Sequence, residues 1–245
     1  MHSSSRSLAL GLALLAASCG DDPSASPVVD PGDGGRYAPR IDPAGFVEIV
    51  DNPFLPLGVG GRWVYGGESD GEKERIEVVV TDQRREVMGV STVVVRDTVT
   101  VAGQLVEDTY DWYAQDRVGN VWYFGEDVKD FEAGKVVSTA GSWEAGVDGA
   151  LPGIVMPARP AVGETFRQEF YRGQAEDMFE IIRVDGTLTV PYGRFADVLV
   201  TRDWTPLDAA VVEEKYYARG PGKIREEKAA GGKGFVELVT YTPGR

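Results

Sequence analysis

The chain has 245 residues, and 39 Asp and Glu against 25 Lys and Arg give it a formal net charge of −14. This length fits one all-β domain, and the 42% hydrophobic content is ample for a core. Charge of this sign repels nucleic-acid phosphate, so we expect no nucleic-acid partner. The single His and the single Cys are His2 and Cys19. From Gly20 onward, the sequence therefore excludes Ser-His-Asp and Cys-His catalysis, His or Cys zinc sites and an internal disulfide.

Residues 1–18 have the layout of a secretory signal peptide. A short polar start that contains Arg6 is followed by an apolar run, Leu8–Leu15, and by the small residues 16–18. The next residue is Cys19, and the sequence Leu15-Ala-Ala-Ser-Cys19 resembles a bacterial lipobox, with Ala16 where the usual pattern has Leu. An ordinary cleaved signal with an incidental cysteine is the alternative interpretation.

The lipobox resemblance implies a lipoprotein of the bacterial cell envelope. Cys19 would carry a diacylglycerol and a further acyl chain such as palmitate, and two or more chains make membrane anchoring stable. The following residue is Gly20 and not Asp, which implies the outer membrane if the host has two membranes. Residues 19–45 are rich in Pro, Gly, Asp and Ser, so we expect a lipidated cysteine and a disordered tether there. Residues 46–245 are expected to form a single β-rich domain.

Short apolar or alternating runs, punctuated by Gly, Asp and Pro, begin at Phe46 and predict many strands. Asp116–Asn120 is typical of a hairpin loop, and Asp185-Gly186 predicts a two-residue hairpin turn. No segment of the mature chain has a sustained helical period. We therefore expect an all-β antiparallel meander that forms a half-barrel, a barrel or a sandwich. The first predicted strand begins at residue 62. The later predicted strands include 75–87, 90–101, 105–115, 120–125, 165–171, 176–184, 187–190, 195–203, 211–218, 223–227 and 235–241.

The segment Thr139–Glu164 interrupts this pattern, because it has no strand periodicity and contains several Gly and Pro residues. A loop of this length inside a compact domain is more often functional than not. Its large apolar side chains are costly to expose to water, so we expect one long covering loop over an opening of the sheet. The loop either seals the core or gates a ligand, and both alternatives stay open.

Several motifs resemble those of bacterial envelope proteins. Thr189–Phe195 and Lys215–Arg225 are similar to the closing strands of secreted β-domains, an architecture that resembles the curved sheets of LolA/LolB-like proteins. A family of uncharacterised bacterial lipoproteins shows similar motifs, and the resemblance implies a location and a curved antiparallel sheet but no activity. The motifs shared with that family are Asp51–Leu57, Trp112–Asp116, Gly119–Glu126 and Pro152–Pro157.

These features predict a membrane-anchored envelope lipoprotein, more a binding module than an enzyme. Its ligand would be apolar or amphiphilic, or the partner would be another envelope protein. A purely structural envelope protein is an alternative. We assign no catalytic residue and no cofactor. The candidate ligand-binding residues are Trp112, Trp122, Trp143 and Met156.

Carboxylates offer a second alternative, since His and Cys are absent. In a hairpin built from 107–116 and 121–127, Tyr110 and Trp112 would share one face, and Asp111 and Tyr113 the other. Aromatic rings beside carboxylates suit carbohydrate binding, and two carboxylates about 5–10 Å apart suit glycoside hydrolysis. Calcium, which prefers oxygen ligands, is the metal that this composition suits. The candidate ligands for calcium are Asp108, Asp111, Glu126 and Asp127.

Overall fold

The computed structural model describes residues 37–245, so Cys19 and the predicted signal peptide lie outside the described residues. Within that range, no helix is long and apolar enough to cross a bilayer. The one short helix described is η1 (Pro43–Gly45), and the other elements are antiparallel strands. The strands are β1 (Phe46–Val47), β2 (Arg62–Ser69), β3 (Glu72–Val87), β4 (Val90–Val101), β5 (Gln104–Asp116), β6 (Val121–Glu132), β7 (Lys135–Ser138), β8 (Trp143–Glu144), β9 (Leu151–Met156), β10 (Thr165–Arg167), β11 (Glu169–Phe170), β12 (Met178–Val190), β13 (Gly193–Thr205), β14 (Asp208–Ala218), β15 (Gly222–Ala230) and β16 (Gly234–Thr242).

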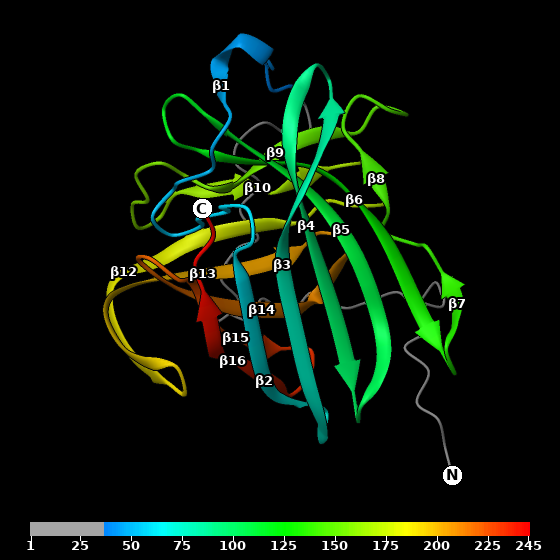
Figure 1. Cartoon of the computed structure of the whole chain (residues 1–245), viewed down its shortest axis with the longest axis vertical. Coiled ribbons are helices and arrows are strands. Elements are labelled where there is room, and N and C mark those ends of the chain that lie inside the picture. Colours follow the sequence, from blue (N-terminus) through cyan, green and yellow to red (C-terminus); the bar gives the residue numbers. More distant parts are fainter. Residues whose placement is uncertain (1–36) are drawn as a thin grey trace, which may run out of the picture.

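The meander curls until its two ends meet, as Figure 1 shows. The strand order is β10-β12-β13-β14-β15-β16-β2-β3-β4-β5-β6-β9-β11. β10 and β11 are consecutive in the chain and are separated only by Gln168, whose backbone N–H donates to the carbonyl oxygen of Asp177 at 2.8 Å. One short run of chain therefore pairs with β12 on one side and with β9 on the other. The sheet is nearly closed into a barrel, which confirms the all-β antiparallel prediction.

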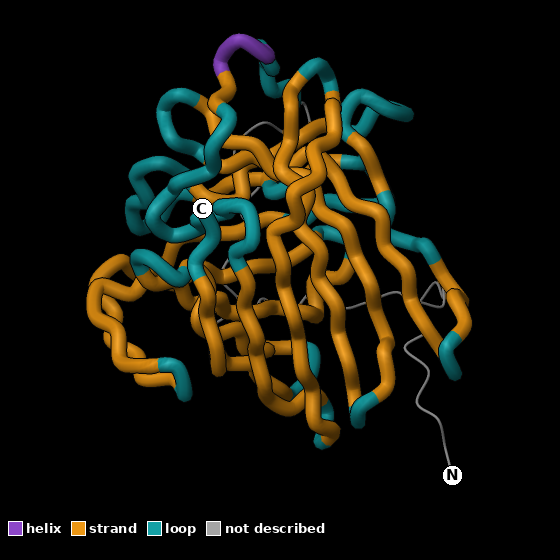
Figure 2. Tube along the Cα trace, viewed as in Figure 1, coloured by secondary structure: helices purple, strands orange, loops and turns teal. Residues whose placement is uncertain are grey.

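Loops and turns lie mostly at the ends of the strands (Figure 2). In the hairpin loop Asp116–Asn120, the structure shows the physical basis of the predicted turn. The Oδ1 atom of Asp116 accepts the backbone N–H groups of Val118, Gly119 and Asn120 at 2.9, 2.9 and 3.0 Å. An aspartate that binds the following backbone in this way stabilises a turn without help from distant residues. The turn between β5 and β6 is therefore set by local sequence.

The prediction of a hairpin turn at Asp185-Gly186 was wrong. β12 runs without interruption through both residues, and its pairing with β13 shifts register on either side of Gly186. A Cβ atom on Gly186 would lie 3.0 Å from the carbonyl oxygen of Val198. Glycine therefore serves close approach of two backbones at a bulge, which is its other common role in strands.

The segment Thr139–Glu164 is only partly a loop, because it contributes β8 and β9 to the sheet. β9 pairs with β6, which is distant in the chain, and with β11, which has only two residues. These pairings therefore leave no local pattern in the sequence. Pro152 and Gly153 hide the strand further. Gly153 is required by packing, since a Cβ there would lie 2.3 Å from the carbonyl oxygen of Arg167.

Buried apolar side chains form two clusters on opposite faces of β4 and β5. Val93 and Val95 belong to the cluster inside the barrel, to which the loop after β1 contributes Phe54 and Leu57. Val94 and Trp112 belong to the second cluster. This alternation is the period of two expected of strands that are covered on both faces. It places Asp111, the register partner of Val95, on the inner face.

Candidate functional site

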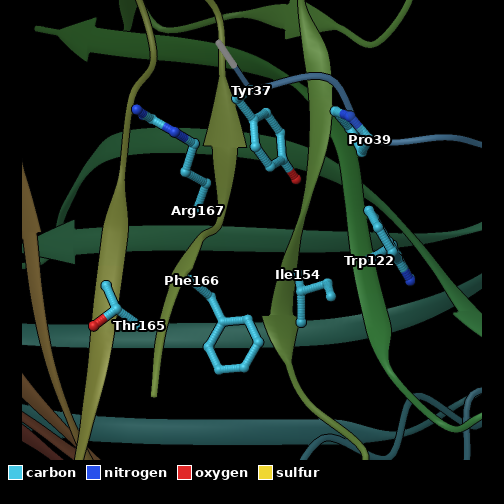
Figure 3. Close-up of a pocket in the computed structure, with 7 residues that line it drawn as sticks. All are labelled: Tyr37, Pro39, Trp122, Ile154, Thr165, Phe166 and Arg167. Carbon is cyan, nitrogen blue, oxygen red and sulfur yellow. The ribbon is translucent and has the colours of Figure 1, made fainter. Parts of the chain in front are cut away.

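A pocket of about 260 Å³ lies where the segment before β1 meets β6, β9 and β10 (Figure 3). Trp122 of β6 and Ile154 of β9 are direct register partners, so both side chains project to the same face of the sheet. The pocket is lined by Tyr37, Pro39, Trp122, Ile154, Thr165, Phe166 and Arg167.

The aromatic walls of this pocket are held in place by hydrogen bonds and ring contacts. The hydroxyl of Tyr37 donates to the carbonyl oxygen of Pro152 at 2.9 Å, and its ring meets Phe170 edge-on. The indole Nε1 of Trp122 donates to Oδ2 of Asp116 at 2.9 Å. Phe166 stacks on a neighbouring ring of β12. The described end of the predicted tether therefore lies against the barrel and closes one side of the pocket.

Arg167 is the charged side chain among the lining residues, and it is buried. Its guanidinium carbon lies 4.7 Å from the ring centre of Phe170 and 5.8 Å from that of Tyr37. Aromatic rings stabilise a cation held over their faces, and the N–H groups of a guanidinium have a geometry suited to carboxylate or phosphate. The arrangement is an apolar pocket with one cationic group at its wall.

The structure separates the four candidate ligand-binding residues. Trp122 lines the pocket, whereas Met156 is fully buried inside the barrel with 0% exposure. Trp112 is buried on the outer face, where the Arg85 guanidinium lies 4.0 Å from its ring centre. Trp143 is buried beside the inner-face residue Glu126, its register partner. These four side chains do not share one site, and their role in binding stays a prediction.

The candidate carboxylates are divided between the two faces of the β5–β6 hairpin. Asp108 and Asp127 lie on the outer face. Nε and Nη2 of Arg96 donate to the two oxygens of Asp108 at 2.7 and 2.9 Å. Nζ of Lys129 donates to Asp127 at 3.0 Å. The four candidate calcium ligands, which also include Asp111 and Glu126 on the inner face, therefore do not form a single set.

Asp111 and Glu126 face each other on the inner side, as direct register partners. The hydroxyl of Tyr123 donates to Oδ1 of Asp111 at 2.6 Å. Burial raises the pKa of Asp111 to about 7. Burial, followed by the negative charge of Asp111, raises the pKa of Glu126 to about 9. A carboxyl that stays protonated at neutral pH can donate a hydrogen bond or a proton, which an exposed carboxylate does not do.

Sequence reasoning missed Tyr37, Arg167 and Glu169. Arg167 and Glu169 lie on β10 and β11, which reach β9 and the pocket only because the barrel closes through them. Tyr37 falls within the segment predicted as a tether. No local pattern marks these residues, because their neighbours come from positions far away in the chain.

No protein-family model matches the chain, and no curated protein matches it. Two solved structures are similar to this chain. One, described as an exported protein with a YmcC-like fold from Bacteroides fragilis, has a TM-score of 0.45 and 16% identity, over 77% of this chain and 98% of that one. The other, described as a lipoprotein from Parabacteroides distasonis, has a TM-score of 0.42 and 12% identity, over 78% of this chain and 99% of that one. Neither is described as LolA/LolB-like, so that resemblance stays a prediction.

Proposed function

We propose that this protein is a lipid-anchored envelope lipoprotein that binds a small amphiphilic ligand in the pocket between β6, β9 and β10. The observation that supports the proposal is an apolar, aromatic-walled pocket of about 260 Å³ with Arg167 in its wall. The ligand would place its apolar part between Trp122, Ile154 and Phe166. An anionic group would meet the guanidinium of Arg167.

The volume of the pocket sets the size of the ligand. A cavity of about 150 Å³ is enough for benzene, and pockets for drug-sized molecules span about 300–1,000 Å³. At about 260 Å³, the pocket suits a single acyl chain or a substituted ring rather than a whole phospholipid. Tyr37 and Pro39 form one wall, so the ligand would contact the segment that leads to the membrane anchor.

Titration calorimetry with laurate and with its uncharged methyl ester tests this proposal. Laurate is expected to bind, and the ester more weakly because it offers Arg167 no charge. Ile154→Phe adds a ring to the pocket wall and is expected to weaken laurate binding at least tenfold. Val136→Phe, on the exposed strand β7, is the matched control and leaves binding unchanged. The proposal is wrong if laurate and its ester both fail to bind at about 1 mM, or if both variants behave alike.

Anchoring is tested separately, because it depends on Cys19 and not on the pocket. Mass spectrometry of protein extracted from membranes is expected to show a diacylglyceryl group and a further acyl chain on Cys19. Cys19→Ala is expected to release the protein from the membrane fraction. An unmodified Cys19 or a chain cleaved elsewhere would contradict the lipoprotein assignment.

A further inference from the structure

A row of carboxyl side chains crosses neighbouring strands on the inner face of the barrel. Asp111 of β5 and Glu126 of β6 are direct partners, and Asp97 of β4 lies diagonally from Asp111, opposite Thr109. The direct step from Asp111 to Glu126 is about 5 Å, whereas the diagonal step from Asp97 to Asp111 is about 7–8 Å. Glu169 lies on β11, beyond the intervening strand β9, and its negative charge acts on Glu126. Asp97, Asp111, Glu126 and Glu169 are called the inner carboxyl row below.

The nearest lysines do not neutralise this row. Nζ of Lys215 lies 3.1 Å from Asp203, and Nζ of Lys223 lies 2.6 Å from Glu226, so each pairs with an acid of β13 or β15. Within residues 37–245, no ion pair joins a lysine or arginine to the inner carboxyl row. Lys223 acts on Asp97 and Asp111 only as a more distant charge.

Two buried polar atoms beside the row are unsatisfied. Oδ1 of Asp97 has no hydrogen-bond donor, although the atom is buried. The indole Nε1 of Trp143, a side chain only 5% exposed, completes no hydrogen bond. The indole nevertheless approaches Glu169 closely enough to lower the pKa of that carboxyl against the larger raising effects of burial and Asp177. Buried polar groups are nearly always paired in proteins, so Oδ1 of Asp97 indicates a missing donor at this place.

Aromatic rings lie directly beside the row. Tyr113 stacks on Tyr123 with ring centres 4.8 Å apart, and Tyr123 meets Trp143 edge-on at 5.4 Å. Faces of such rings attract cations, and more strongly where water is displaced. Glu126 and Asp97 are only half-buried, so this part of the inner face is reached by solvent. Carboxyls and rings together are suited to an organic cation.

The raised pKa values of the row also indicate that no positive charge compensates its carboxylates. Burial is the largest cause that raises the pKa of Glu126 to about 9 and that of Glu169 to about 8. Repulsion within the row adds to both. A bound cation would favour the ionised carboxylates and release protons. Ionised Glu169 would also be a stronger acceptor for Nε1 of Trp143.

We propose that the inner carboxyl row binds a linear aliphatic polyamine, with successive ammonium groups against Asp97, Asp111 and Glu126 and methylene linkers along Tyr113 and Tyr123. A direct step of about 5 Å and a longer diagonal step suit cations joined by a shorter and a longer linker, as propyl and butyl are. The first ammonium supplies the donor that Oδ1 of Asp97 lacks. This site is separate from the apolar pocket, so its test does not depend on the proposed function.

Titration calorimetry of the natural full-length protein in neutral detergent, with spermidine as the probe, tests the proposal. Spermidine is expected to bind the natural protein, and at least tenfold more weakly to Glu126→Gln and Asp111→Asn. Asp127→Asn removes the neighbouring carboxylate on the outer face of the same strand and is the matched control, with unchanged affinity. This comparison separates the site from general attraction to an acidic protein, because all three variants remove one acidic side chain.

Proton release gives a readout that a structural role would not change. At pH 7.5, titrations in two buffers of different ionisation enthalpy are expected to show net release of protons on spermidine binding, and less release in Glu126→Gln. The proposal is overturned if spermidine does not bind, if Asp127→Asn weakens binding as much as Glu126→Gln, or if no proton is released. Displacement of spermidine by equimolar calcium would also overturn it, in favour of a metal site. Laurate affinity is expected to stay the same in Glu126→Gln, which keeps the two proposals distinguishable.

Discussion

Replacing Glu126 by Gln is expected to make the protein more stable at neutral pH. The carboxyl faces the barrel interior opposite Asp111, and burial with that neighbour raises its pKa from an ordinary 4.5 to about 9. Between these two pH values, the folded protein holds a proton that the unfolded chain has released. The free energy of unfolding therefore falls as the pH rises through this range. Gln has nearly the same size and does not ionise, so the variant escapes this loss.

The size of the gain follows from the distance between the working pH and the ordinary pKa. At pH 7 the unfolded carboxyl is ionised and the folded one is protonated, which destabilises the natural protein by up to about 3 kcal/mol. Relaxation and solvent at this half-buried side chain reduce the figure, and we expect a gain of about 1–3 kcal/mol. For a domain of this size, each kcal/mol raises Tm by about 2–4 °C. At pH 4 the gain is expected to vanish, because both states are protonated.

Thermal unfolding followed by circular dichroism, at intervals from pH 4 to pH 8, measures the effect. Asp127→Asn is the control, since its carboxylate pairs with Lys129 at 3.0 Å on the outer face and is half exposed. We expect the control to change the free energy of unfolding by no more than about 0.5 kcal/mol at any pH. A Glu126→Gln protein that is no more stable than the natural one at pH 7.5, or a gain that persists at pH 4, would refute the reasoning.

The same variant is expected to bind spermidine more weakly, so its stability rises while its affinity for spermidine falls. Replacing a residue whose role is only structural lowers the stability of the protein. A carboxyl kept for a ligand leaves a strained, self-repelling site behind when the ligand is absent, and its removal stabilises the fold. The two measurements on Glu126→Gln therefore distinguish a binding role from a structural one.

Three further changes test the fold. Met156→Ala empties space at a fully buried side chain and is expected to cost about 2–5 kcal/mol in urea unfolding, whereas Val137→Ala, 55% exposed, changes little. Gly153→Ala brings a Cβ to 2.3 Å from a backbone oxygen and is expected to lower Tm by several degrees, whereas Gly45→Ala, with open space around it, is neutral. Gln115→Ala removes the Oε1 atom that accepts the N–H groups of residues 51 and 52, so hydrogen exchange at those two amides is expected to quicken severalfold. Unchanged exchange there would show that the loop is held by other contacts.

Strand positions and hairpins could be predicted from the sequence because their causes are local. The predicted strand 90–101 has the bounds of β4, and the aspartate of Asp116–Asn120 makes its turn from its own side chain. The alternation along β5 was also predictable, since a strand period of two places Asp111 and Trp112 on opposite faces. Asp185-Gly186 misled, because a glycine that permits a tight turn permits a bulge equally well.

By itself, the sequence determined the all-β class, the meander, the absence of His and Cys chemistry from the domain and the placement of Asp111 and Trp112 on opposite faces of one strand. Only the tertiary structure decided that the sheet closes through β10 and β11, and this closure places Arg167 in the pocket and Glu169 beside the carboxyl row. The physical reason is the separation along the chain of the residues that interact. Turns and alternation depend on residues a few positions apart, whereas the environment of a buried charge depends on strands that meet only when the barrel is complete.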